Sequence, residues 1–215
     1  MRPLRVIAID GPAGSGKSTV ARHLAERLGL AYLDTGAMYR AVAFAALRRG
    51  IDPADDEPVA RMAPSLELTI DGDRVTVDGV DATIEVRGPE VTRAVSSVAA
   101  NAAVRAELVA RQREWVVSRG GAVVEGRDIG SVVFPDAELK AYLHARADVR
   151  ADRRHREVSD LAYEAVAADM ARRDTVDTER EADPLRCADG AVVVDTSDRS
   201  VDEIVDDLLA RLEQP

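Results

Sequence analysis

A strand, a glycine-rich loop and a helix follow one another near the start of the chain, and this order constrains the fold more than any other feature. From Val6 the sequence reads VIAIDGPAGSGKSTVARHLAERLG. Residues 4–9 are mostly apolar and β-branched, which predicts a central strand of a parallel sheet. Residues 18–28 carry apolar side chains at helical spacing. We therefore expect an α/β fold that begins with this strand–loop–helix unit.

The loop matches the pattern G-x-x-x-x-G-K-[ST], which is typical of proteins that bind nucleoside triphosphates. Its glycines let the backbone turn tightly and aim N–H groups inward, and the positive end of the next helix favours phosphate. Lys17 supplies a charge for the outer phosphates, and Ser18 supplies a hydroxyl ligand for Mg²⁺. The residues expected to bind ATP are Gly11, Pro12, Ala13, Gly14, Ser15, Gly16, Lys17, Ser18 and Thr19.

Composition and charge exclude several classes of protein. The formal net charge of the 215 residues is −10, which argues against general binding to nucleic acid or to a membrane surface. The single cysteine, Cys187, excludes an internal disulfide, and the three histidines show no metal-ligand spacing. The opening MRPLRVIAID is too short for a signal peptide, and no apolar run reaches membrane-spanning length. We therefore expect a cytoplasmic protein.

The segment after the loop favours a kinase over a switch or a motor. No N-K-x-D guanine-reading motif follows, and no apolar strand ends in paired acidic residues. Instead YLDTGAMYRAV predicts a short strand at 32–34 and a helix that opens at Thr35. Tyr39 and Arg40 then fall in the first turns of that helix, at the sheet edge where open α/β folds bind ligands. Arg40 can bind a phosphate with its planar fork, and Tyr39 can pack against a sugar or base.

Residues 66–86 interrupt the alternation of strands and helices. Apolar and polar residues alternate with period two, and Asp-Gly pairs at 71–72 and 78–79 mark tight turns, which predicts a small antiparallel meander. A helical region at 89–117 follows, with an expected break at Asn101, a good capping residue. Because Ser96 and Arg105 would face opposite sides of one straight helix, the break would let both face one pocket.

Charged residues follow the later strands. Residues 122–125 predict a central strand, and Arg127 and Asp128 come directly after it, at the functional edge. Strands are also expected at 139–144 and 191–194. The arginine-rich helix after 144, with Arg150 and Arg154, is either a solvated helix or a mobile lid whose arginines meet the transferred phosphoryl group.

A second cluster of charge occurs in ARRDTVDTEREADPL. Arg173, Asp177 and Arg180 are spaced by four and three residues, so we expect their side chains on one helical face.

Taken together, these segments resemble the bacterial cytidylate kinases, which are nucleoside monophosphate kinases. The likeness rests on IDGPAGSGKST, LDTGAMYR, the meander, SSVAANAAVR, EGRDIGSVVFPDA and RRDTVDTEREADPL, and it covers essentially the whole chain. It implies a P-loop kinase with a five-stranded parallel sheet flanked by helices, a small antiparallel β insert that binds the monophosphate, and a helical lid. It also implies transfer of the γ-phosphoryl group of ATP to CMP or dCMP, with Mg²⁺, in pyrimidine nucleotide metabolism.

The resemblance carries roles onto matching residues. Arg40 and Arg127 would bind the acceptor phosphate, and Lys17 would act on the transferred group. The remaining residues form three groups. The cytosine would be read by Thr35, Ser96, Arg105 and Asp128, the sugar would be held by Arg173 and Asp177 with Tyr39 beside it, and the phosphates would be approached by Arg150, Arg154 and Arg180. The loop departs from the family pattern in that Ala13 and Ser18 stand where some relatives carry a hydroxyl and a glycine, so the likeness does not support an acceptor contact from position 13.

The same reading sets expectations for organisation. We expect one kinase domain over 1–215, with a core of 1–60 and 119–215, an insert at about 61–118 and a lid at about 150–180. A monomer is expected, with small-molecule substrates and neither nucleic acid nor membrane as partner. Two alternatives stay open: a P-loop kinase for another small acceptor such as UMP or shikimate, and a regulatory module that binds ATP without fast turnover.

Overall fold

The computed structural model describes residues 4–157 and 162–213. By its internal contacts the chain divides into two compact units, which we call unit 1 (residues 1–32 and 116–215) and unit 2 (residues 33–115). The predicted boundaries of core, insert and lid stay predictions.

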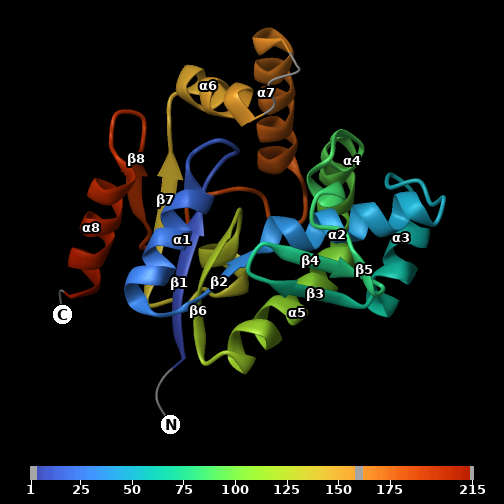
Figure 1. Cartoon of the computed structure of the whole chain (residues 1–215), viewed down its shortest axis with the longest axis horizontal. Coiled ribbons are helices and arrows are strands. Elements are labelled where there is room, and N and C mark those ends of the chain that lie inside the picture. The colour runs from blue at the N-terminus through green and yellow to red at the C-terminus, as the bar shows by residue number, and fades with distance from the viewer. Residues whose placement is uncertain (1–3, 158–161, 214–215) are drawn as a thin grey trace. The chain divides into compact units, whose positions relative to one another are not determined.

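A five-stranded parallel sheet with the order β2-β6-β1-β7-β8 forms the centre of unit 1 (Figure 1). The chain passes into unit 2 within β2. The strands are β1 (Arg5–Asp10), β2 (Ala31–Asp34), β6 (Gly121–Gly126), β7 (Leu139–His144) and β8 (Val192–Asp195). Residues of β1 and β6 are buried on both faces, as expected of central strands in a parallel sheet. The α/β prediction and its strands are thus confirmed.

The helices of unit 1 are α1 (Lys17–Leu28), α6 (Ala147–Glu157), α7 (Tyr163–Glu179) and α8 (Val201–Leu212). Helices α1 and α8 pack together and share a core with the sheet that includes Ile7, Leu24, Leu143 and Leu208. Helices α6 and α7 pack against each other (Figure 1). A capping box starts α8, because the Ser200 hydroxyl and the Glu203 carboxylate each accept a backbone N–H of the other.

Unit 2 combines a three-stranded antiparallel sheet with helices. Its sheet has the order β3-β4-β5, with β3 at Leu68–Asp71, β4 at Arg74–Val77 and β5 at Val80–Asp81. Asp78 and Gly79 both have positive φ, 50° and 74°, as a type I′ hairpin turn requires. The predicted meander is therefore confirmed, and its second turn lies at the Asp78-Gly79 pair. Its first turn is at Gly72 and Asp73, because Asp71 is the last residue of β3 and pairs with Arg74.

The helices of unit 2 are α2 (Thr35–Arg48), α3 (Asp56–Met62), α4 (Pro89–Ala100) and α5 (Ala102–Ser118), the last of which ends in unit 1. Helix α2 packs against the three-stranded sheet, and α3 and α4 pack against α2. Asn101 separates α4 from α5, and its Oδ1 accepts the N–H groups of Ala103 and Val104, which confirms the expected break. Trp115 donates its indole N–H to the carbonyl of Ile70 at 3.2 Å, so α5 is tied to β3.

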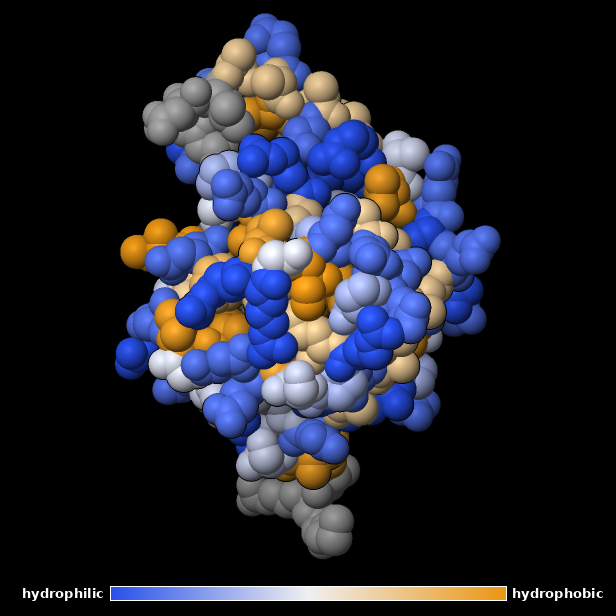
Figure 2. Space-filling model, turned by 90° about the vertical axis from the view of Figure 1, so that its right-hand side faces the viewer, coloured by the Kyte–Doolittle hydropathy of each residue, from blue (hydrophilic) through white to orange (hydrophobic). Residues whose placement is uncertain are grey.

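Two observations concern the surface. Within the described ranges, no helix combines the length and apolar composition that crossing a bilayer requires. On the face drawn in Figure 2, hydrophilic side chains predominate and hydrophobic ones form small groups between them.

Candidate functional site

Two glycines shape the predicted phosphate-binding loop of unit 1. Gly11 has φ of 147°, and a Cβ there would lie 2.0 Å from the carbonyl oxygen of Leu143, so only glycine fits. Gly16 is the N-cap of α1 with φ of 86° and no side chain to cap the first N–H groups. The positive end of the α1 dipole and its first N–H groups therefore lie at the loop, which is the arrangement that binds anions at a helix N-terminus.

Three basic side chains converge on three successive carbonyls of this loop. Arg127 Nη1 donates to Gly11 at 3.0 Å, Lys17 Nζ donates to Pro12 at 2.7 Å, and Arg150 Nη1 donates to Ala13 at 3.0 Å. Arg127 directly follows β6, Lys17 is the first residue of α1, and Arg150 lies in the first turn of α6. Cations far apart in the sequence thus gather where the sequence predicts phosphates.

An acidic residue that carries no predicted role adjoins the loop. Glu125, in β6, is 3% exposed, and its carboxylate accepts hydrogen bonds from Ser18 Oγ at 3.0 Å and from the Tyr32 hydroxyl. The Arg22 guanidinium lies 4.5 Å from the centre of the Tyr32 ring. The sequence signal was a charged side chain inside an otherwise apolar strand. Ser18 and Glu125 together offer the oxygen ligands that Mg²⁺ prefers.

Arg127 is held from two sides. Its Nε donates to Asp177 at 2.8 Å, in addition to the bond with the loop. Burial by itself would lower the pKa of Arg127, but the carboxylates of Asp177, Asp174 and Glu125 outweigh it and the pKa is raised. The guanidinium therefore stays charged, and its position relative to the loop is well defined.

Helices α6 and α7 contribute a second ion pair beside the loop. Arg150 donates to Asp174 at 2.6 Å. A Cβ on Gly14 would lie 2.9 Å from both the Arg150 carbonyl oxygen and the Met170 Cε atom, so both helices contact the loop closely. Arg154 pairs instead with Glu157 on its own helix at 2.7 Å.

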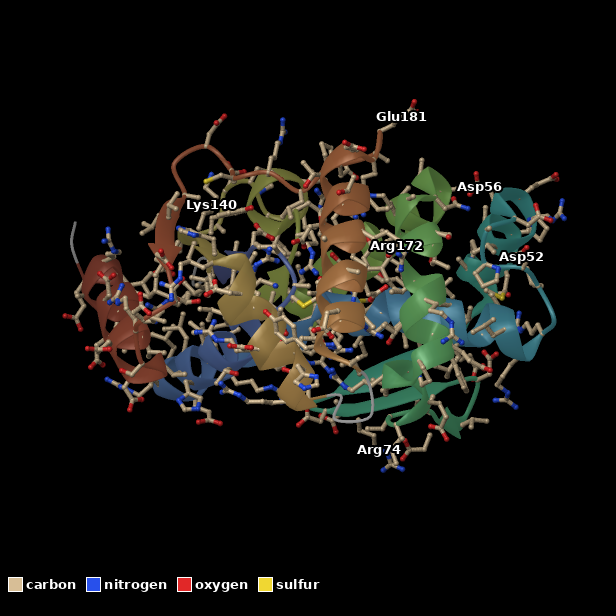
Figure 3. All side chains as sticks on the ribbon, turned by 90° about the horizontal axis from the view of Figure 1, so that it is seen from above. Asp52, Asp56, Arg74, Lys140, Arg172 and Glu181 are labelled. Carbon is tan, nitrogen blue, oxygen red and sulfur yellow. The ribbon has the colours of Figure 1, made fainter. Side chains whose placement is uncertain are left out.

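The arginines on the two sides of α7 differ in burial and in hydrogen bonding. On the exposed side, Arg172, which is labelled in Figure 3, pairs with Asp169 at 2.6 Å. On the other side, the Nε of Arg173 is buried and has no hydrogen-bond partner among the described residues. Burial, followed by the charge of Arg127, lowers the pKa of Arg173. A buried cation beside another cation suits a site that receives an anion.

Arg180 is the C-cap residue of α7, and its backbone N–H still donates to the Val176 carbonyl of the last helical turn at 3.1 Å. Its Nε and Nη2 donate to the carbonyl of Asp183 at 2.8 and 2.5 Å, which holds the side chain in the following loop. There it lies 3.7 Å from Asp128, and both side chains are almost fully buried.

The predicted site residues of unit 2 are also largely buried. Thr35 opens α2, and Arg40 donates to the Val86 carbonyl at 3.1 Å and to Thr92 Oγ1 at 2.9 Å. Arg105 is 2% exposed, and its guanidinium carbon lies 5.5 Å from the centre of the Tyr39 ring.

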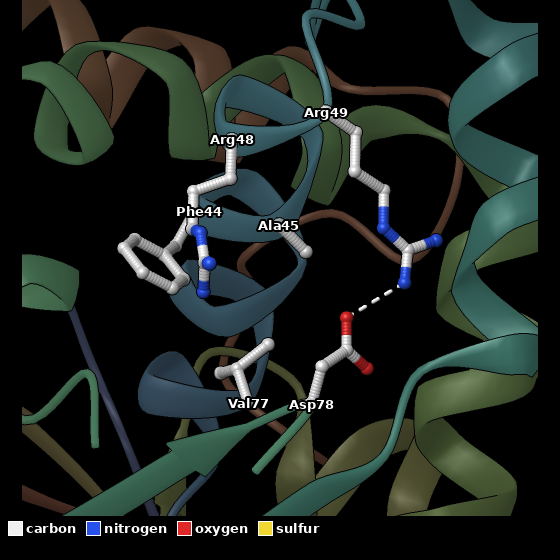
Figure 4. A pocket seen from close by; sticks show the side chains of 6 residues that line it. All are labelled: Phe44, Ala45, Arg48, Arg49, Val77 and Asp78. Carbon is white, nitrogen blue, oxygen red and sulfur yellow. Dashed lines mark hydrogen bonds and ion pairs between the residues drawn. The ribbon is translucent and has the colours of Figure 1, made fainter. Parts of the chain in front are cut away.

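Ser96 in α4 is 8% exposed. A small pocket in this unit has an Arg49–Asp78 ion pair of 2.6 Å at its edge (Figure 4). None of the predicted site residues is among those that line it, which are Phe44, Ala45, Arg48, Arg49, Val77 and Asp78.

Comparison with known proteins gives a consistent answer. The family model for cytidylate kinase matches residues 7–214. A cytidylate kinase of Mycolicibacterium paratuberculosis is 52% identical over 211 residues, which cover 94% of this chain and 92% of that one. The Bacillus subtilis cytidylate kinase is 44% identical over 216 residues, which cover 97% and 96%.

Solved structures agree on the fold. A gluconokinase from Sinorhizobium meliloti aligns with a TM-score of 0.51 at 20% identity, over 99% of this chain and 93% of that one. An uncharacterized protein from Eubacterium ventriosum aligns with a TM-score of 0.55 at 13% identity, over 98% and 99%. At such identities the likeness concerns the fold alone.

Proposed function

The chain belongs to the cytidylate kinase family, and from this premise we propose how its residues perform the reaction. The reaction is the transfer of the γ-phosphoryl group of ATP to CMP or dCMP, which gives ADP and CDP or dCDP. The observation that carries the proposal is the convergence of Lys17, Arg127 and Arg150 on successive carbonyls of the glycine loop. Cations gathered there can bind the phosphates of two nucleotides and screen their repulsion.

The donor would bind along residues 11–19. The N–H groups at the start of α1 would receive the inner phosphates, and Lys17 would exchange its bond with Pro12 for the outer ones. Ser18 and Glu125 would hold Mg²⁺, which supplies charge stabilisation to the transferred group when it is bound. Their hydrogen bond places two oxygen ligands of the preferred kind side by side.

The acceptor phosphate would be bound by Arg127 and Arg40. A nucleoside monophosphate is largely a dianion near neutral pH, because its second pKa is about 6, as in other phosphate monoesters. It already presents a nucleophilic oxygen, so no general base is needed. That oxygen bonds to the γ-phosphorus, the bond to the β–γ bridging oxygen breaks, and ADP leaves with the electron pair.

Polar side chains would bind the base and the sugar. An ionised carboxylate only accepts hydrogen bonds, so Asp128 would accept one from the 4-amino group of cytosine and would repel the 4-keto oxygen of uracil. Thr35, Ser96 and Arg105 would complete the base site.

Arg173 and Asp177 would hold the sugar, with Tyr39 beside it. Arg150, Arg154 and Arg180 would approach the phosphates from the predicted lid, whose closure would limit hydrolysis of ATP by water. The chain is proposed to act as a cytoplasmic monomer, as composition and the resemblance suggest.

A coupled assay of ADP release tests the function directly. The acceptors are CMP, dCMP, UMP, AMP and shikimate, each with ATP and Mg²⁺. We expect turnover that depends on CMP or dCMP. Turnover with only UMP or shikimate would indicate another P-loop kinase, and none with any acceptor would indicate a regulatory module that binds ATP.

A further inference from the structure

Asp10 is a buried carboxylate to which no role has been given so far. It ends β1, one residue before the phosphate-binding loop, and is 4% exposed. Its Oδ1 accepts the N–H of Ile129 at 2.8 Å, and its Oδ2 accepts the N–H of Gly130 at 2.7 Å. These residues open a π-helical turn over Ile129–Val133, where backbone N–H groups have no helical partner. Asp10 therefore caps this turn from a neighbouring strand.

The capped turn is continuous with two residues that are proposed to bind the acceptor. Arg127 and Asp128 lie between Gly126, which pairs in register with Asp10, and Ile129, which donates to the Asp10 carboxylate. Both ends of this dipeptide are thus attached to one residue. Any shift of the Asp10 side chain would move the dipeptide relative to the loop that starts at Gly11.

The buried surroundings of Asp10 disfavour its charged form. The pKa of Asp10 is raised to about 6, mainly by burial and to a smaller extent by the Asp128 carboxylate. The N–H groups of Gly130 and Ile129, and the charge of Lys17, oppose this rise. Burying a carboxylate is costly even when it is hydrogen-bonded. A carboxylate kept here suggests a task that a neutral side chain would perform less well, and accepting two N–H groups at once is such a task.

We propose that Asp10 is a positioning residue for the acceptor: through the N–H groups of Ile129 and Gly130 it holds Arg127 and Asp128 in register with the phosphate-binding loop. The inference rests on the acceptor roles proposed for Arg127 and Asp128. Both oxygens of Asp10 bind backbone N–H groups, so it acts through the turn and not on a nucleotide.

Asp10→Asn tests the inference, because an amide keeps the size of the side chain and only one of its two acceptor atoms. We expect kcat/KM for CMP to fall about tenfold or more, with the KM for ATP within about twofold of wild type. Preference for CMP over UMP should fall as well. Hydrogen exchange at the Ile129 and Gly130 amides should become faster.

Two further variants accompany it. Asp195→Asn is the matched control, because Asp195 also ends a strand, β8, and accepts the N–H of Ser197 at 2.9 Å; it should leave both KM values unchanged. Asp10→Ser keeps one acceptor without placing an amide N–H₂ against a backbone N–H. If Asp10→Asn does not fold, Asp10→Ser should show the same fall in kcat/KM for CMP.

The outcomes separate the inference from the proposed function. Faster amide exchange with unchanged CMP kinetics would overturn the positioning role and leave the function intact. Equal losses for ATP and CMP would also overturn it, because they would indicate a general structural role. If the wild-type enzyme showed no turnover with CMP, the proposed function would fail first and the acceptor role of Asp10 would fail with it.

Discussion

The phosphate-binding region of unit 1 and the three-stranded sheet of unit 2 both combine glycine turns with arginine–aspartate pairs, but they differ in solvent exposure. The side chains of Arg127 and Asp177 are 20% and 11% exposed, whereas those of Arg74 and Asp81 in the sheet are 69% and 50% exposed. Exposed pairs contribute little to stability because water and salt screen them. Partly buried pairs interact more strongly and hold fixed positions. We therefore expect the Arg127–Asp177 pair to contribute more to fixed side-chain positions than the exposed Arg74–Asp81 pair does.

Lys17→Met should give the largest effect. It removes a cation that is proposed to bind the donor phosphates, while keeping the length and bulk of the side chain. We expect kcat to fall about 10³-fold, in the range seen when a charge that stabilises a phosphoryl-transfer transition state is removed. The measurement is ADP release at saturating ATP and CMP, with the melting temperature as a control for folding. A kcat within tenfold of wild type would contradict the assignment.

Stability against pH offers the next largest effect, at Asp10. The folded-state pKa of about 6 is above the ordinary value of 3.8, so the folded protein holds this proton more tightly than the unfolded chain does. The stability contributed by Asp10 is therefore present below about pH 4 and is lost as pH rises to about 6. At 1.36 kcal/mol per pKa unit, the loss is about 3 kcal/mol.

Denaturant unfolding of wild type and Asp10→Asn at pH 4.5 and pH 7.5 measures this difference. The wild type should lose stability relative to the variant as pH rises, whatever the absolute cost of the substitution. A difference between the two proteins that is constant with pH would show that Asp10 does not titrate in this window.

Arg127→Lys should lower kcat/KM for CMP about 10²-fold. Lysine keeps the charge but cannot donate to Asp177 and to the Gly11 carbonyl with the fixed fork of a guanidinium. The KM for ATP should change much less than that for CMP. Arg74→Lys on the exposed sheet is the matched control and should leave both constants unchanged. Equal kinetics for Arg127→Lys and wild type would remove Arg127 from the acceptor site.

Asp128→Asn should reduce the preference for CMP over UMP about tenfold, because an amide can donate to the uracil oxygen that a carboxylate repels. The ratio of kcat/KM values for the two acceptors is the measurement. It is independent of the amount of folded enzyme, so partial unfolding does not imitate the effect. An unchanged ratio would assign base selection to other residues.

Asp78→Asn should have the smallest effect. Arg49, together with the Glu67 N–H, lowers the pKa of Asp78, but the pair is exposed. Asparagine also tolerates the positive φ of this turn position. We expect a loss of less than about 1 kcal/mol in the free energy of unfolding. A larger loss would show that the hairpin depends on its ion pair more than exposure suggests.

Most of the fold could be predicted because the deciding signals are local. The Asp78-Gly79 pair specifies a hairpin turn by its backbone preference, and Asn101 separates two helices by accepting the N–H groups that follow it. The glycine loop is likewise a continuous pattern. Such signals depend on a few neighbouring residues and need no knowledge of tertiary packing.

The parts that sequence did not reveal depend on distant partners. Asp10 and Glu125 receive their roles from N–H or hydroxyl donors about a hundred or more positions away, at Ile129 and at Ser18. The nucleotide roles of the predicted residues stay predictions until the kinetic tests are made.

Trp115 gives unit 2 its own optical signal. It is the only tryptophan of the chain, and its indole is anchored to β3 through Ile70. Intrinsic emission will therefore follow the melting of this small sheet, while circular dichroism averages over every helix. If the two signals change at different denaturant concentrations, the units unfold in separate steps, and a single midpoint will not describe the stability of the enzyme.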